Sequence, residues 1–180
     1  MLFRSALRRE AGLGTAEIER VNVRIFRHAL KIASVDWPSK PVEAAFSIRY
    51  LVAALLHHGQ VGIAQTEAPA LDDPDLIAMG QRVHVEGCDE FQRAFPARRP
   101  AEVVLHLRDG RTLTAQRDLR RGDPEDPYDW DGLVARMHAF APDLHGPRAD
   151  ALTTWCRDFL DPALDDGVCP LPDSLFSRQL

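Results

Sequence analysis

PVEAAFSIRYLVAALLHHG, residues 41–59, is the stretch that decides the fold. After Ser47, apolar residues recur at the three, four and seven spacings of one helical face: Ile48, Leu51, Val52, Leu55 and Leu56. The Ser47 hydroxyl can accept from free backbone N–H groups of the first turn, and Gly59 suits a left-handed helix end. The stretch therefore predicts a helix around which the rest of the chain packs.

A polar triplet, Ser47, Arg49 and Tyr50, lies at the entrance of this helix. The first turn of a helix offers unpaired N–H groups and a partial positive charge, and Arg49 adds a guanidinium. Together these groups suit a carboxylate or a phosphate. An ordinary core helix with a good cap would carry the same residues, so both interpretations stay open at this point.

Composition excludes several classes of protein. The chain has 180 residues, of which 45% are hydrophobic, enough for one domain with a real core, or one domain with a terminal appendage. Its net charge of −5 is well mixed along the sequence, which argues against a nucleic-acid partner. The longest apolar run, residues 51–56, is too short to span a bilayer, so we expect no membrane association. The N-terminal MLFRSALRRE lacks the apolar region of a signal peptide, so we expect a cytoplasmic protein.

Further elements follow from local patterns. Alternating apolar and polar residues predict strands at about 20–26 and 82–86, and a hairpin of 102–107 with 111–117 around Asp109 and Gly110, a dipeptide typical of a type I′ turn. Helices are predicted at 2–10, from Asp72 or Asp73 to about Gly80, from Asp129 or Asp131, and at about 148–160, with an irregular tail from Pro162. The predicted fold class is α+β, a small antiparallel sheet of about four strands packed with helices, plus C-terminal helices.

The sequence predicts no metal site. Adjacent helical residues point about 100° apart, so His57 and His58 are not expected to reach one ion easily. Cys88, Cys156 and Cys169 are odd in number and lack CxxC spacing, so we read them as plain thiols. The acidic loop at 123–131 lacks the ligand order of an EF-hand, which leaves a solvated loop with helix caps.

The order of five pieces resembles the C-terminal part of the MmgE/PrpD (2-methylcitrate dehydratase) family over nearly the whole chain. The pieces are ERVNVRIF, PVEAAFSIRYLVAALLHHGQVGIAQ, LDDPDLIAMGQRVHV, AEVVLHLRDGRTL and RGDPEDPYDWDGLVARM. The resemblance implies an α+β lid domain at 1–146 and a C-terminal helix and tail at 147–180 that packs on a helical domain. Family members are lyases and isomerases of small carboxylic acids: 2-methylcitrate dehydratase, cis-aconitate decarboxylase and iminodisuccinate epimerase. The resemblance also implies a homodimer without metal or organic cofactor.

The family's FSxxY pattern matches Phe46, Ser47 and Tyr50, and the resemblance places that tyrosine at the active-site cleft. We therefore predict Tyr50 as catalytic and Ser47 and Arg49 as substrate-binding, Arg49 on the physical ground that its donor fork suits a carboxylate. Ala45 replaces the basic residue that the family has before the aromatic, which leaves the role of that position in doubt. The Lys and His motif and the acid–base histidines of the family's helical domain have no counterpart in this sequence.

Two functions follow from this resemblance. The chain is the lid half of a carboxylic-acid lyase or isomerase, as one chain of a split enzyme or as a shortened product, inactive without a separate helical-domain chain. Alternatively it is a non-catalytic dimerisation or regulatory module derived from that domain. A third interpretation, an unrelated α+β ligand-binding domain, would be favoured by a wholly parallel sheet or by loss of the 102–117 hairpin. In the isolated chain we expect Tyr50→Phe to do almost nothing.

Overall fold

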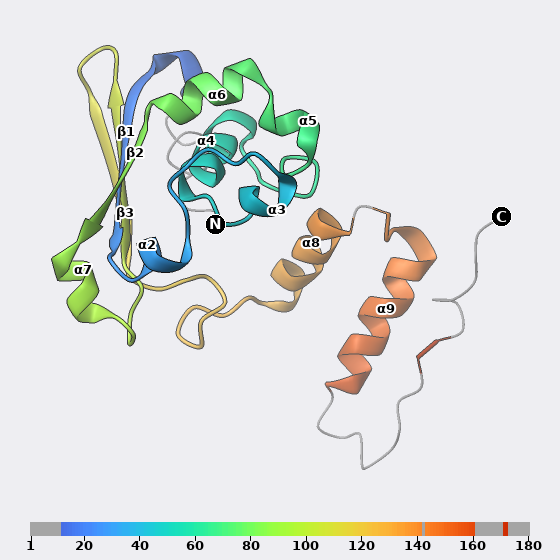
Figure 1. Ribbon diagram of the computed structural model, residues 1–180. Coiled ribbons are helices and arrows are strands. Elements are labelled where there is room, and N and C mark those ends of the chain that lie inside the picture. Colours follow the sequence, from blue (N-terminus) through green and yellow to red (C-terminus); the bar gives the residue numbers. More distant parts are fainter. Residues whose placement is uncertain (1–11, 142, 161–170, 173–180) are drawn as a thin grey trace. The chain divides into compact units, whose positions relative to one another are not determined.

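The computed structural model describes residues 12–141, 143–160 and 171–172 (Figure 1). The chain forms two compact units that divide between Pro127 and Tyr128. The helix predicted over residues 2–10 and most of the tail after Pro162 lie outside the described residues.

The first unit holds the sheet and the helices around it. Its strands are β1 (Ile18–Phe26), β2 (Val83–Cys88), β3 (Ala101–Leu107) and β4 (Thr112–Arg117). Its helices are the 3-10 turn η1 (Thr15–Glu17) and α2 (Ala29–Ile32), α3 (Pro41–Ala44), α4 (Ile48–His58), α5 (Ala68–Leu71), α6 (Pro74–Gln81) and α7 (Asp89–Ala94). The second unit consists of α8 (Trp130–Phe140) and α9 (Gly146–Phe159). The predicted α+β class and the strand positions are confirmed.

The sheet is mixed, so the prediction of a purely antiparallel sheet is wrong. Its strand order is β2-β1-β3-β4. β3 runs antiparallel to both of its neighbours, whereas β1 and β2 are parallel, with Val21 opposite Val83. Helices α2 to α6 separate these two strands and return the chain to the end of the sheet where β1 begins, as a parallel pair requires. The sheet contains the 102–117 hairpin and is not wholly parallel. Neither of the two features that would favour an unrelated ligand-binding domain is therefore observed.

The main core lies between one face of the sheet and helices α4 and α6, which Figure 1 places along that face. Alternate strand residues point into this core, and Val21, Val23 and Leu105 are fully buried. α4 contributes five further buried apolar residues, Val52, Ala53, Ala54, Leu55 and Leu56. A smaller cluster of Phe26, Ala29, Cys88 and Phe91 holds α2 and α7 at the end of β1. The helix predicted from the apolar spacing is therefore the centre of the first unit.

The predicted helix over residues 41–59 is interrupted before Ser47, which is extended with φ −88° and ψ 111°. The segment around Ser34 holds this break in place, because Ser34 N donates to Phe46 O (2.9 Å) and Ile48 N donates to Ser34 O (2.9 Å). α3 thus ends at Ala44 and α4 begins at Ile48. Gly59 terminates α4 at φ +77°, as predicted.

The β3–β4 connection differs from the predicted type I′ turn. Such a turn needs positive φ at both central residues, but every described residue with positive φ is a glycine, so Asp109 does not qualify. Gly110 supplies the left-handed residue (φ +85°), and its N–H donates to Leu107 O (3.0 Å). Asp109 instead accepts from Arg111 N (3.0 Å), which stabilises a longer loop.

The second unit begins at a capped helix. The Asp129 carboxylate accepts from Gly132 N (2.8 Å), which confirms the predicted start of α8. The Arg157 guanidinium of α9 lies 5.0 Å from the centre of the Trp130 ring and joins the two helices. Among the described residues of either unit, no helix combines the length and apolarity needed to cross a bilayer.

Candidate functional site

Ser47 connects the first turn of α4 to the loop that contains Asp36. It is 1% exposed, and its hydroxyl accepts from Tyr50 N (3.2 Å) while donating to Asp36 O (2.6 Å). The predicted N-cap is confirmed. Since one hydroxyl makes both bonds, Ser47 fixes the loop and the first turn of α4 together.

Tyr50 is fully buried on the first turn of α4. Its hydroxyl donates to the backbone carbonyl of Gln65, and its ring meets the Trp37 ring edge-on with centroids 5.0 Å apart. Burial raises the pKa of the Tyr50 hydroxyl, and the nearby charge of Asp73 raises it further. Tyr50 is therefore a neutral hydrogen-bond donor at physiological pH, and in this structure it donates to the backbone.

Trp37, which meets the Tyr50 ring, also contacts α5 and α6. Its indole Nε1 donates to Leu71 O (3.1 Å), and its ring covers Gly80 of α6 so closely that a Cβ at Gly80 would lie 2.1 Å from Trp37 Cζ3. Trp37 thereby links the loop before α3 to α5 and α6. The position of Tyr50 depends on this contact as well as on its own helix.

Arg49 is half-buried beside Tyr50 and Ser47. Its Nε is buried, and no hydrogen-bond partner for it lies among the residues that the structure describes. A buried donor without a protein partner is uncommon in folded proteins and is a candidate for binding a water molecule, an ion or a ligand. Within the predicted triplet, Arg49 is therefore the residue whose donor is available to a carboxylate. The substrate-binding roles of Arg49 and Ser47 and the catalytic role of Tyr50 stay predictions.

His57 and His58 end α4 next to Asp73, the N-cap of α6. One ligand atom from each of the three side chains lies within 4.8 Å of the others, and the two imidazole centroids are 4.6 Å apart. Burial lowers the pKa of His58, the neighbouring His57 lowers it further, and Asp73 opposes both. The sequence predicted that these adjacent side chains would not reach one ion easily; in the structure a ligand atom of each lies within 4.8 Å of the other and of Asp73, and binding of an ion stays untested.

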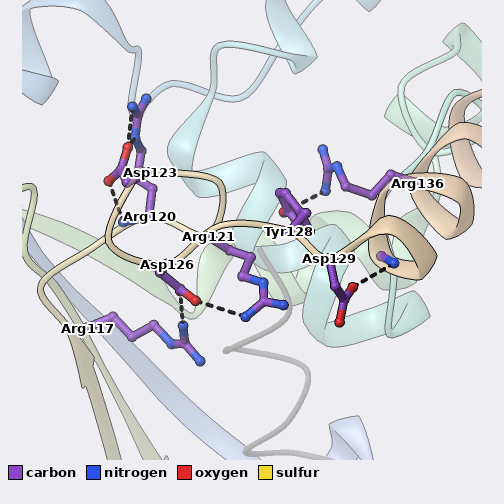
Figure 2. Close-up of polar contacts among 9 residues, drawn as sticks. Arg117, Arg120, Arg121, Asp123, Asp126, Tyr128, Asp129 and Arg136 are labelled. Carbon is purple, nitrogen blue, oxygen red and sulfur yellow. Dashed lines mark hydrogen bonds and ion pairs between the residues drawn. The ribbon is translucent and has the colours of Figure 1, made fainter. Parts of the chain in front are cut away.

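A network of arginines and aspartates follows β4 (Figure 2). The Asp123 carboxylate, 7% exposed, accepts from Arg120 N (2.9 Å) and from Arg120 Nη2 (2.7 Å). Asp126 accepts from Arg117 Nη1 (2.9 Å) and Arg121 Nη1 (2.8 Å). Most of this loop is exposed and Asp129 caps α8, as predicted, and the ion pairs of Asp123 and Asp126 cross-link it in addition.

The Asp123 contacts predict an acid-sensitive stability. Hydrogen bonds from Arg120 hold the pKa of Asp123 below its usual range, so this carboxylate stabilises the fold above its unfolded-state pKa of about 3.9, and the stabilisation disappears as pH falls through the lower folded-state pKa. We expect Asp123→Asn to unfold at lower urea concentration than the wild type at pH 7, with the difference shrinking below about pH 4. Glu125→Gln changes an exposed residue of the same loop and is the control. It should alter neither the urea concentration of unfolding at pH 7 nor its dependence on pH. A constant difference between pH 7 and pH 3 would contradict this account.

Comparison with known sequences identifies the class of domain. The sequence model described as the MmgE/PrpD C-terminal domain matches residues 4–155. The chain therefore belongs to the MmgE/PrpD family, through its C-terminal domain, as the order of sequence pieces indicated. A search of curated proteins finds no significant match.

Proposed function

We propose that this chain forms the lid side of a MmgE/PrpD-type active site, which dehydrates, decarboxylates or epimerises a small carboxylic acid once a helical domain supplies the Lys and His groups. The observation that carries the proposal is a set of exposed large apolar side chains that includes the phenylalanine of the family's FSxxY pattern. It consists of Ile32, Val42 and Phe46, which are 68%, 67% and 61% exposed, and is called the lid patch below.

The lid patch belongs to segments that the backbone holds together. Ile32 ends α2 two residues before Ser34, which is hydrogen-bonded to Phe46 O and Ile48 N. Val42 lies in α3, one helical turn before Phe46. Large apolar side chains that are exposed on neighbouring segments are typical of an interaction site. An apolar partner surface fits the lid patch, and its docking would bring that partner next to Arg49.

The reaction class needs a base, an acid and cations that hold the substrate. Arg49 fits the last role because its Nε has no partner among the described residues and because it follows Phe46 of the lid patch by three positions. Tyr50 is neutral and can donate a proton or a hydrogen bond, provided that its hydroxyl exchanges the Gln65 carbonyl for a substrate oxygen. The base comes from the helical domain in this proposal. The chain then works without an organic cofactor, in the cytoplasm, and as part of a homodimer or of a complex with a separate helical chain.

The non-catalytic alternative rests on the same lid patch. If the chain is a dimerisation or regulatory module, two copies cover each other's Ile32, Val42 and Phe46. The two functions differ in the partner: self-association without turnover favours the module, and turnover with a helical domain favours the enzyme.

Complementation tests the proposal. The purified chain alone should turn over neither 2-methylcitrate nor cis-aconitate, whereas addition of the helical domain of a MmgE/PrpD enzyme should produce turnover. Phe46→Asp should weaken that assembly about 30-fold or more, since burial of a large anchor at the centre of an interface contributes about 2 kcal/mol or more. Thr112→Asp, which places the same charge on an exposed position of β4, should leave assembly unchanged. Turnover by the chain alone, or assembly that is indifferent to Phe46→Asp, would overturn the proposal.

A further inference from the structure

The cluster of His57, His58 and Asp73 is a second polar site, separate from the lid patch and from Arg49. It joins the C-terminal turn of α4 to the start of α6, and one nitrogen or oxygen of each residue lies within 4.8 Å of the other two. We propose that these three side chains bind a divalent transition-metal ion of the zinc class.

The ligand set fits such an ion. Two imidazoles and one carboxylate are typical ligands of Zn²⁺, and three protein ligands leave a fourth position for water or an anion. Ligand atoms around a tetrahedral Zn²⁺, with bonds of about 2.0–2.1 Å, lie about 3.4 Å apart. To bind an ion, the ligand atoms therefore need to approach one another by roughly an ångström. Changes in the side-chain torsion angles can supply that movement without moving the backbone.

Backbone N–H groups of α6 orient the Asp73 carboxylate as a metal ligand. Its Oδ1 accepts from Asp75 N (2.9 Å) and Leu76 N (3.3 Å), which fixes the carboxylate and leaves the second oxygen for a metal. Carboxylate ligands are commonly oriented by hydrogen bonds of this kind. The cluster lies between the C-terminal end of α4, whose partial negative charge favours a cation, and the N-terminal end of α6, whose partial positive charge opposes one, so the proposal rests on the geometry and the ligand types.

Titration of the tag-free full chain with ZnCl₂ in a non-chelating buffer at pH 7.5, followed by calorimetry, tests the site. One equivalent should bind with Kd below about 10 μM. His57→Gln, His58→Gln and Asp73→Asn should each weaken binding at least about tenfold. Asp73→Asn is the most informative, because Asn caps a helix as well as Asp and the fold should survive. His84→Gln and His138→Gln, which alter histidines outside the cluster, should bind like the wild type.

The absorption spectrum of the Co²⁺-loaded chain gives an independent readout. Nitrogen and oxygen ligands should give visible bands of low-symmetry Co²⁺ without a thiolate-to-metal band, and these should be lost in Asp73→Asn. Circular dichroism checks that each variant is folded, and a variant that is not folded leaves the decision to the remaining two and to the spectrum. A wild type that does not bind Zn²⁺, variants that bind as tightly as the wild type, or a thiolate band would overturn the proposal. Neither measurement depends on enzymatic activity.

Discussion

Gly80→Ala should lower the free energy of unfolding by about 2 kcal/mol, although alanine is the better helix former. Gly80 lies inside α6, where replacement by alanine ordinarily gains about 1 kcal/mol. Here the new Cβ would lie 2.1 Å from Trp37 Cζ3 and 2.8 Å from Cε3, closer than side chains approach in folded proteins. The indole is held by its bond to Leu71 O and by Tyr50, so it does not move away without breaking other contacts.

Urea unfolding monitored by circular dichroism measures this effect. Gln81→Ala, at the next and exposed position of α6, is the control and should change stability by less than about 0.5 kcal/mol. Replacing Trp37 by leucine in the Gly80→Ala background should recover part of the loss, because two residues in contact do not act additively. A Gly80→Ala protein as stable as the wild type would show that the indole does not cover α6 in solution.

Tyr50→Ala should cost about 3–5 kcal/mol, because it empties the space of the largest fully buried side chain of the first unit. Tyr50→Phe keeps the ring and its edge contact with Trp37, and loses only the hydrogen bond to Gln65 O. The carbonyl then lacks its partner, so we expect a loss of about 1–2 kcal/mol. This revises the expectation, drawn from sequence, that Tyr50→Phe would do almost nothing in the isolated chain.

The same pair of variants separates the structural and catalytic roles of Tyr50. Unfolding curves give the structural cost, and turnover of the complemented enzyme, measured where Tyr50→Phe is still fully folded, gives the catalytic one. If Tyr50 acts on substrate, turnover should fall at least about 100-fold in Tyr50→Phe. Full turnover in a folded Tyr50→Phe enzyme would confine the residue to the core and contradict its predicted catalytic role.

The elements that sequence predicted well are those specified by a few neighbouring residues. Ser47, Asp73 and Asp129 each cap the helix that follows them, as their side chains and positions indicated. The strands followed from alternation along a single segment, and Gly59 ended α4 as expected. In these cases the physical cause, a cap or an alternating face, lies within one turn or one strand of the residue concerned.

The features that sequence missed depend on contacts between distant segments. The parallel pairing of Val21 with Val83 requires the path of all the helices between them. The burial of Tyr50 depends on Trp37 and Gln65, neither of which is marked by a local pattern as its neighbour. The convergence of His57 and His58 on Asp73 depends on how α4 packs on α6. A spacing rule applied to one helix does not contain that information.

The candidate site was predicted in part. The FSxxY pattern located the α4 entrance and the family. Nothing in the sequence, however, distinguished the buried Ser47 and Tyr50 from Arg49, whose Nε has no partner within the described part of the chain. Val42 and Phe46 are visible in the sequence as apolar residues before Ser47, but an apolar residue at such a position could equally belong to the core. Their exposure followed only from the fold.

The central position of β1 has a consequence for how the chain acquires its structure during synthesis. β1 is made early, yet both of its partners are made late: Arg24 meets Glu102 across a separation of 78 residues, and Val21 pairs with Val83 as well as with Leu105. Closing such long loops before any pairing energy is gained makes folding slow. A nascent chain therefore holds Val21, Val23 and Ile25 without either partner strand until β2 has left the ribosome, and with one edge still open until β3 follows, and an open strand edge exposes the chain to aggregation in that interval.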